Sequence, residues 1–257
     1  MRRYLLTPAV LALAALAAPS YAAITLKLDG FKVGSTVGTG AADSASNAAL
    51  SRTMQWQVLG LNGFPQVAGG AQVKDIAGQF GGTIDLGTGS GVQSFSAYCV
   101  ELTQTFNPFP TTSLVYTSES GSTYFSSDVN SNLGKLYSQG IVFDTAEKTA
   151  AFQIAMWEII YEKSGTFGVG NSNLSGNADF TTYTGSTASA STFALSQSYL
   201  NALPTTTNNV TLTVYKNATY QDLIVATPVP EPVTAALMLV GLTGIGFFGV
   251  LRARRSS

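Results

Sequence analysis

The stretch "AFQIAMWEII", Ala151 to Ile160, forms the middle of an expected helix that runs from about Thr145 to Glu162. Asp144 is a suitable N-cap, and Glu147 three residues later nearly completes a capping box. A turn of about 100° per residue predicts one stripe that faces solvent and a second that faces the core. The solvent stripe comprises Glu147, Ala151, Glu158 and Glu162, and the core stripe comprises Thr149, Gln153, Met156, Trp157 and Ile160.

The pattern therefore places the amide of Gln153 in an apolar interior. An unpaired buried amide costs about 1–3 kcal/mol. Hydrogen bonds to the backbone of a neighbouring strand are the usual way to satisfy such a group. A second explanation is that the amide is the partner of Cys99.

Cys99 is the only cysteine of the chain and lies in "SAYCVEL". On a strand it shares one side with Ala97 and Glu101, and the other side is formed by Tyr98, Val100 and Leu102. A thiolate is a good nucleophile. Against a glutamine carboxamide it can displace ammonia and leave an internal thioester, which a partner's primary amine can then attack. Proximity and orientation supply the effective concentration for such a reaction.

The two motifs resemble the Cys-Gln thioester domain of bacterial surface adhesins. In that family a cysteine follows an aromatic residue on a strand, and a Q-x-A-apolar-W stretch opens a helix further along. Tyr98-Cys99 and the stretch from Gln153 to Trp157 match both patterns, and Phe152 stands where the family often has threonine.

The resemblance covers about residues 90–165. It implies that Cys99 and Gln153 form the thioester, and that Tyr98, Glu101 and Trp157 shape or shield it. On this interpretation Glu101 helps to deprotonate the incoming amine.

The two ends of the chain predict export. Residues 1–22 combine Arg2 and Arg3, an apolar run and the small residues before Ala22, as a cleaved signal peptide does. At the other end, residues 233–251 carry no charge and are long enough to span a membrane. Residues 252–257 follow with Arg252, Arg254 and Arg255, which favours a cytoplasmic tip.

Pro230, Glu231 and Pro232 precede this apolar span. A Pro-Glu-Pro motif, an apolar span and a basic tail in this order resemble the PEP-CTERM sorting signal, here covering residues 228–257. That resemblance implies an exosortase substrate of a Gram-negative bacterium. Such a precursor is transiently anchored in the inner membrane, and its body is then released to the cell surface or the extracellular matrix of a biofilm.

Composition excludes several function classes for the body, residues 23–227. The chain has no histidine, which excludes Ser-His-Asp and Cys-His catalysis and the usual zinc sites. Removal of both ends leaves 8 of 13 Lys+Arg and 13 of 14 Asp+Glu, a net charge of about −5 without a basic cluster. We therefore expect no nucleic-acid partner. We also expect no metal, no cofactor and no enzymatic turnover; a polysaccharide hydrolase with the carboxylate pair Glu101 and Glu158 is the enzymatic alternative.

The body has the pattern of one α+β domain, mainly antiparallel β with a small helical lobe. Alternating stretches predict strands, and three stretches predict helices, with a polar loop over residues 170–189. The strands are expected at 24–28, 54–61, 81–86, 93–102, 113–118, 210–215 and 221–227, and the helices at 130–138, 145–162 and 192–203. Two functions follow: a covalent adhesin or cross-linker, or a structural matrix protein in which Cys99 is a buried free thiol.

Overall fold

The protein is described by a computed structural model, which covers residues 23–58, 73–102, 104, 112–162, 167–169, 180–183 and 187–229. The expected signal peptide at 1–22 and the sorting signal from residue 230 onward lie outside these ranges. Among the described residues, none of the helices has the length and apolarity that crossing a membrane requires.

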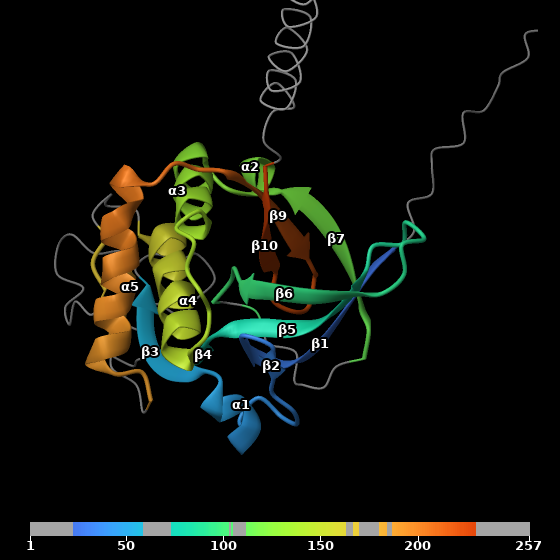
Figure 1. The fold of residues 1–257 in the computed structure, drawn as a ribbon, viewed down its shortest axis with the longest axis horizontal. Helices are drawn as coiled ribbons and strands as arrows, with labels where there is room; N and C mark the ends of the chain where they lie inside the picture. Colours follow the sequence, from blue (N-terminus) through green and yellow to red (C-terminus); the bar gives the residue numbers. More distant parts are fainter. Residues whose placement is uncertain are drawn as a thin grey trace, which may run out of the picture.

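Antiparallel strands form the larger part of the regular structure and helices the smaller part, as expected for an α+β protein (Figure 1). The strands are β1 (Ile24–Val33), β2 (Thr36–Val37), β3 (Arg52–Val58), β4 (Val73–Ala77), β5 (Gln79–Asp85), β6 (Gln93–Cys99), β7 (Leu114–Ser120), β8 (Phe180–Tyr183), β9 (Val210–Lys216) and β10 (Leu223–Pro228). The helices are α1 (Ala45–Ala49), α2 (Gly121–Tyr124), α3 (Ser127–Tyr137), α4 (Ala146–Tyr161) and α5 (Ala190–Ala202), followed by a 3-10 turn at Leu203–Thr205.

The larger sheet closes on itself. Its order is β2-β1-β5-β6-β10-β9-β7, and β1 also pairs with β7 through Ile24↔Tyr116 and its neighbours. The pairing between β6 and β10 is short and consists of Leu223↔Cys99 and Ile224↔Tyr98. The ring therefore has few ladder hydrogen bonds at the position of Cys99, and that is where α4 approaches.

A smaller sheet, β4-β3-β8, lies beside the ring. Its strand β8 falls within the expected polar loop 170–189, so that expectation was wrong for residues 180–183. The threonines and aromatic residues of this stretch suit a strand, and they pair with β3 from Gln55↔Tyr183 to Val58↔Phe180.

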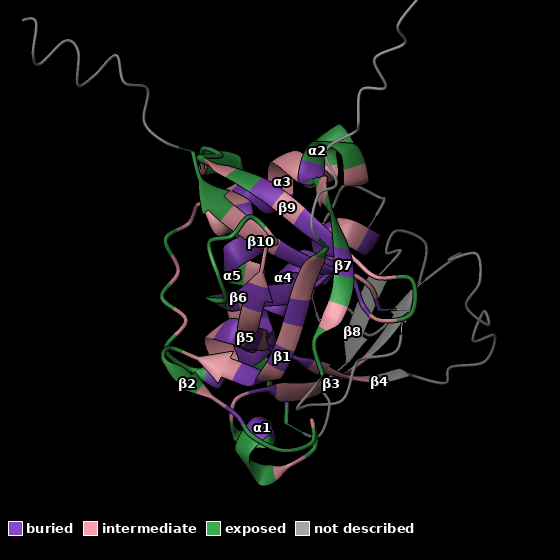
Figure 2. Cartoon of the chain, turned by 90° about the vertical axis from the view of Figure 1, so that its right-hand side faces the viewer, coloured by how far each residue is buried: buried purple, intermediate pink, exposed green. Residues whose placement is uncertain are grey.

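Helix α4 lies between the ring and α5 (Figure 1), and α3 packs against both α4 and strand β9. In Figure 2, α4 is coloured as buried and lies behind the strands. One of its faces joins the core of the sheets through Ala150, Ile154 and Trp157. Another face joins a second core, with α3, α5, β9 and β10, through Phe152 and Met156. A helix that is covered on nearly all sides has no need of an amphipathic pattern.

This enclosure corrects the predicted solvent stripe. Ala151, Glu158 and Glu162 are buried, and only Glu147, at the start of the helix, is partly exposed, where it pairs with Arg52. The periodicity found the core face but could not reveal that α5 covers the opposite face. The N-cap is also Thr145 rather than Asp144, because the Thr145 side chain accepts a hydrogen bond from the backbone N–H of Lys148.

The expected strand alternation holds up to the end of β6. Ala97 and Cys99 belong to the core of the sheets, whereas Tyr98 and Val100 belong to the second core. Leu102 does not follow this pattern, since it lies in the same core as Cys99. The strand ends at Cys99, and the chain beyond it no longer alternates.

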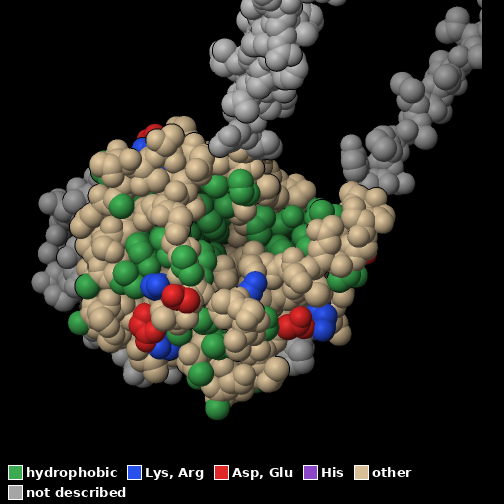
Figure 3. All heavy atoms as spheres, viewed as in Figure 1, with side chains coloured by type: hydrophobic (Ala, Val, Ile, Leu, Met, Phe, Trp, Pro, Cys, Tyr) green, Lys and Arg blue, Asp and Glu red, His purple; other side chains and the backbone are tan. Residues whose placement is uncertain are grey.

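Charged side chains are sparse on the face shown in Figure 3, and positive and negative groups lie mostly side by side. Salt bridges of this kind join Lys27 to Asp29 at 2.8 Å and Lys148 to Asp144 at 2.7 Å.

Candidate functional site: the Cys99–Gln153 pair

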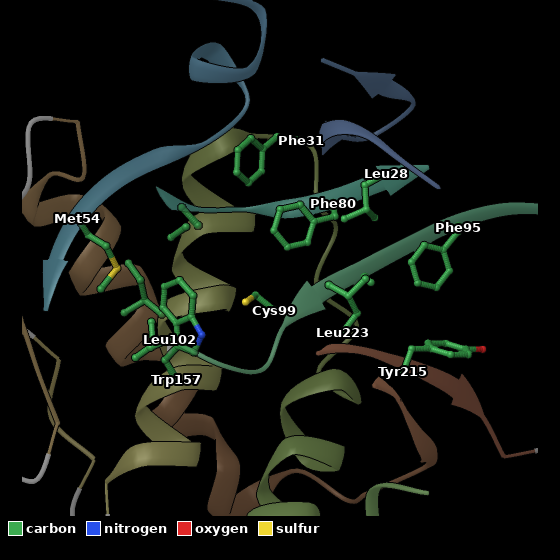
Figure 4. Close-up of a cluster of buried hydrophobic side chains, with 14 of the residues drawn as sticks. Leu28, Phe31, Met54, Phe80, Phe95, Cys99, Leu102, Trp157, Tyr215 and Leu223 are labelled. Atoms are coloured by element: carbon green, nitrogen blue, oxygen red, sulfur yellow. The ribbon is translucent and has the colours of Figure 1, made fainter. Parts of the chain in front are cut away.

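Cys99 is the last residue of β6 and points into the core of the sheets (Figure 4). Its side chain is 2 % exposed, and its thiol donates a hydrogen bond to the backbone oxygen of Glu101 at 3.0 Å. Burial raises the pKa of the thiol well above its ordinary value, and the negative charge of Asp75 raises it further. The thiol is therefore protonated at neutral pH and protected from solvent.

Gln153 lies in the middle of α4 and is completely buried. Its Oε1 accepts a hydrogen bond from the backbone N–H of Cys99 at 2.9 Å, and its Nε2 donates one to the backbone oxygen of Cys99 at 2.8 Å. The amide thus binds both backbone groups of the residue that carries the thiol. The two residues are thus neighbours through the Cys99 backbone, and the amide is hydrogen-bonded to a neighbouring strand, while the thiol bonds the Glu101 backbone oxygen.

The backbone of Cys99 at the end of β6 explains why Gln153 makes this contact. Cys99 pairs with Leu223 only at the end of the short β6–β10 ladder, and its own N–H and C=O need partners because they are buried. Gln153 lies on the core face of α4, and its flexible side chain reaches both groups. Its amide N–H donates to the C=O of Cys99 and its amide oxygen accepts from the N–H. The same contact brings the carboxamide carbon next to the cysteine.

Trp157 stands one helical turn after Gln153 and is 1 % exposed. Figure 4 shows the sulfur of Cys99 pointing toward the side where the Trp157 ring lies. The indole N–H of Trp157 has no hydrogen-bond partner among the described residues. Trp157 and Cys99 are buried in the same core.

Tyr161, which the sequence analysis did not name, closes the same side of the site one further turn along α4. Its hydroxyl accepts a hydrogen bond from the backbone N–H of Leu102 at 3.0 Å and donates one to the backbone oxygen of Val100 at 3.4 Å. The tyrosine thus fixes the chain just after Cys99. The spacing of four residues from Trp157 was the available signal for it.

Tyr98 lies on the other side of β6 from the thiol. Its ring packs against Phe152 at a centroid distance of 4.7 Å and against Phe143 at 5.7 Å, in the second core. It supports the strand that carries Cys99, but it does not cover the sulfur.

Glu101 contacts the site through its backbone, which accepts the thiol hydrogen bond. Its carboxylate lines a hollow of about 570 Å³ together with Tyr124 and Asp222. The pKa of Glu101 is raised by burial and by the charge of Asp222. Sequence reasoning missed Asp222, because nothing in the chain indicates that residue 222 lies beside residue 101.

The remaining predicted site residues lie either apart from this site or outside the described residues. Glu158, the second member of the alternative carboxylate pair, binds the backbone N–H of Gly168 at 2.7 Å on another part of α4. The Pro230-Glu231-Pro232 motif and the arginines at 252, 254 and 255 fall outside the described ranges. No cluster of metal-ligating side chains is found within the part of the chain that the structure describes.

No protein-family model matches the chain, and no curated protein does. Among solved structures, the fold is similar to the N-terminal domain of the Streptococcus pyogenes pilus tip adhesin Cpa. The identity is 15 %, 73 % of this chain and 97 % of the other are covered, and the TM-score is 0.38.

A second neighbour is the N-terminal thioester domain of a surface protein from Clostridium perfringens, with 16 % identity, coverage of 68 % and 99 %, and a TM-score of 0.33. A cysteine-to-alanine mutant of that domain matches at 14 % identity and a TM-score of 0.31. The neighbours are thus domains of a pilus tip adhesin and of a bacterial surface protein. The chemistry of the present site is inferred below from Cys99 and Gln153 themselves.

Proposed function

We propose that this protein is a covalent surface adhesin or matrix cross-linker that uses an internal thioester between Cys99 and Gln153. The observation that supports this most is the double hydrogen bond between the Gln153 amide and the backbone of Cys99, at 2.9 and 2.8 Å inside the core. Each molecule captures one partner permanently, so the proposed role involves no turnover.

The geometry favours formation of the bond in three ways. The amide is held beside the cysteine, so the reaction is intramolecular and benefits from a high effective concentration. The backbone N–H of Cys99 donates to Oε1 and stabilises the negative charge that develops on this oxygen during attack. Burial of both residues keeps water from the product.

The atoms balance without any further reagent. The thiol turns from the Glu101 carbonyl toward the carboxamide carbon, the Sγ–Cδ bond forms, and the amide nitrogen leaves as ammonia with the thiol proton. A primary amine of a partner later attacks the same carbon, the Sγ–Cδ bond breaks, and Cys99 recovers its proton. The partner is then joined to Gln153 by an amide bond.

Intact mass tests this proposal. We expect the purified protein to be lighter than its sequence by the mass of one ammonia, and small amines to couple at Gln153. The Cys99→Ala variant should have full mass and couple nothing. A wild-type protein of full mass with one free thiol after unfolding would contradict the proposal.

A structural matrix protein is the second candidate. The observation that favours it is that both polar groups of the Gln153 amide are already satisfied by the Cys99 backbone, so the contact also serves an unreactive core. A free thiol that titrates only on unfolding, at full mass, would support this candidate.

We further propose that the body reaches the cell surface or matrix through export, transient anchoring in the inner membrane and processing by an exosortase. The order of signal peptide, Pro-Glu-Pro motif, apolar span and arginine tail supports this route. The net charge of about −5 in the body makes a nucleic-acid partner unfavourable.

A further inference from the structure

We propose that the hollow of about 570 Å³ beside Glu101, called here the amine pocket, binds the partner's primary amine as its ammonium ion before the amine attacks the thioester. The substrate class is therefore an alkylammonium such as a lysine side chain. This inference rests on the proposed thioester and adds the route and the recognition of the nucleophile.

The amine pocket adjoins Cys99 through two backbone contacts. Its wall residue Glu101 accepts the thiol hydrogen bond at 3.0 Å, and its wall residue Asp222 accepts the backbone N–H of Val100 at 2.9 Å. Leu223, next to Asp222, pairs directly with Cys99. The pocket therefore ends at the strand segment that carries the proposed reactive bond.

A second hollow, of about 630 Å³, lies between α3 and the last turn of α4. It is lined by Asp128, Ile160 and Glu162 among others, and Ile160 is seven residues beyond Gln153 on the helix. About two helical turns separate it from the amide. Of these two hollows, only the amine pocket adjoins Cys99.

The wall of the amine pocket offers acceptors that lack donors. Oε2 of Glu101 and Oε1 of Gln104 are shielded from solvent and have no hydrogen-bond partner among the described residues. Both side chains line this same hollow. Buried polar atoms are normally paired, so two orphan acceptors on one wall point to a donor that is supplied from outside. An ammonium group supplies three N–H donors and a positive charge.

Asp222 adds a fixed negative charge beside these acceptors. It is 4 % exposed, and its carboxylate accepts hydrogen bonds from the Tyr124 hydroxyl at 2.9 Å and from the backbone N–H of Asn217 at 2.8 Å. These contacts hold the carboxylate in place at the rim of the hollow. The positive charge of Lys216 offsets part of the repulsion between the two carboxylates, and a second cation beside Glu101 would offset more of it.

The chain itself already places one alkylammonium at this rim. Nζ of Lys216 lies 5.4 Å from the centroid of the Tyr124 ring and 2.9 Å from Oε2 of Glu119. Lys216 is held by Glu119 and the tyrosine face, and its positive charge also lowers the pKa of Glu101 from the rim. The rim is thus chemically suited to a lysine side chain.

The proton balance gives Glu101 a defined role. The ammonium binds and transfers one proton to the Glu101 carboxylate, which yields the free amine. The amine nitrogen attacks Cδ of Gln153, the Sγ–Cδ bond breaks, and the second amine proton passes to the sulfur of Cys99. The products are an amide, a thiol and a protonated Glu101, which returns its proton to solvent.

The test compares two nucleophiles on the purified protein by following the mass added at Gln153. Propylamine is cationic at neutral pH, whereas hydroxylamine is mostly uncharged. We expect the rate with propylamine to saturate with concentration in the wild type, and the rate with hydroxylamine to rise linearly. Glu101→Gln should slow propylamine by about tenfold or more and hydroxylamine by less than about twofold.

Asp222→Asn should show the same selectivity. The matched control is Asp128→Asn, which removes one negative charge at the second hollow and should change neither rate. Linear kinetics with both nucleophiles in the wild type, or an equal loss of both in Glu101→Gln, would overturn the amine pocket while leaving the thioester intact. A wild type that couples neither nucleophile would overturn the thioester itself, and the amine pocket with it.

Discussion

One contact of Gln153 serves both the structural role that the hydrogen bonds show and the reactive role proposed above. The amide satisfies the backbone N–H and C=O of Cys99 at the end of β6. The same contact places the amide carbon beside Cys99. The structural role depends on the backbone of Cys99 and not on its thiol. Mutations at the two positions should therefore have different effects on stability.

Gln153→Leu removes both hydrogen bonds and leaves the N–H and C=O of Cys99 unsatisfied in the core. We expect a loss of about 2–4 kcal/mol in the free energy of unfolding. Relative to wild-type protein in which the thiol and the amide are not joined, Cys99→Ala keeps the two hydrogen bonds and deletes only a sulfur atom, so we expect a loss of about 1 kcal/mol. Denaturant unfolding measures both values, and an equally large loss in both variants would show that the thiol itself holds the site together.

A good part of the site could be predicted from the sequence. The inward direction of Gln153, the strand side of Cys99 and the nearness of Trp157 follow from helical and strand periods. The partners of Glu101 do not follow, because Tyr124 and Asp222 come from distant segments that no local period relates to it.

Helix α4 connects the two cores and carries a buried carboxylate near its C-terminal end. Burial raises the pKa of Glu158 to about 7, the hydrogen bond from the backbone N–H of Gly168 lowers it, and the charge of Glu162 raises it. The folded protein thus favours the protonated form of Glu158. The contribution of this group to stability is fully present below pH 4.5, the ordinary value, and is lost as the pH rises through about 7.

Glu158→Gln keeps an acceptor for Gly168 and removes the ionisation. Between pH 4.5 and pH 7, we expect the wild type to lose roughly 3 kcal/mol of unfolding free energy relative to this variant. Urea unfolding of both proteins across this range measures the difference. Parallel stability curves would contradict the burial of a carboxylate at this position.

Strands β1 and β5 approach each other closely at Gly82. A β-carbon there would overlap the backbone carbonyl of Lys27, next to the register shift between Leu28 and Gly30. We expect Gly82→Ala to lower the unfolding free energy by about 1–3 kcal/mol.

Gly81→Ala is the matched control, because its added carbon would meet side-chain atoms of Val37 and Lys32 at 3.0–3.2 Å, a milder overlap than that with the Lys27 carbonyl oxygen at Gly82. Thermal unfolding compares the two variants. A larger loss in Gly81→Ala than in Gly82→Ala would contradict the described pairing of β1 with β5.

Helices α3, α4 and α5 and the long strands were predictable because their patterns are local, whereas the short helices α1 and α2 were not predicted. The short strand β4, the strand β8 and the full burial of α4 were not, since each depends on a neighbour from a distant part of the chain. Glu158 illustrates this: its stripe looked polar in the sequence, whereas α5 and residues 167–169 lie against that end of the helix.

The whole molecule is an antiparallel ring of strands with a helical lobe on one side, and Cys99 lies where the two meet (Figure 1). The α+β class was predictable from composition and order. The closure of the ring through β1 and β7 was not, because it joins the first strand to one about ninety residues later. Within this ring, β6 pairs with β5 on one side and with β10 on the other, and Cys99 lies at the end of β6 where α4 contacts it.

The sequence features at the two ends of the chain predict how the protein is processed. Replacement of Pro230, Glu231 and Pro232 by alanine should leave the uncut precursor in the inner-membrane fraction of an exosortase-bearing host, because the apolar span remains attached. Immunoblots of membrane and extracellular fractions measure this. Release of the variant at the wild-type level would contradict processing at this motif.

The most direct measurement is the intact mass of the purified wild-type protein beside that of Cys99→Ala. If the thiol and the amide have joined in the folded core, the wild type lacks the mass of one ammonia relative to its sequence, and the variant does not. A wild type at full sequence mass, with a thiol that becomes titratable on unfolding, would show that the two groups meet without reacting.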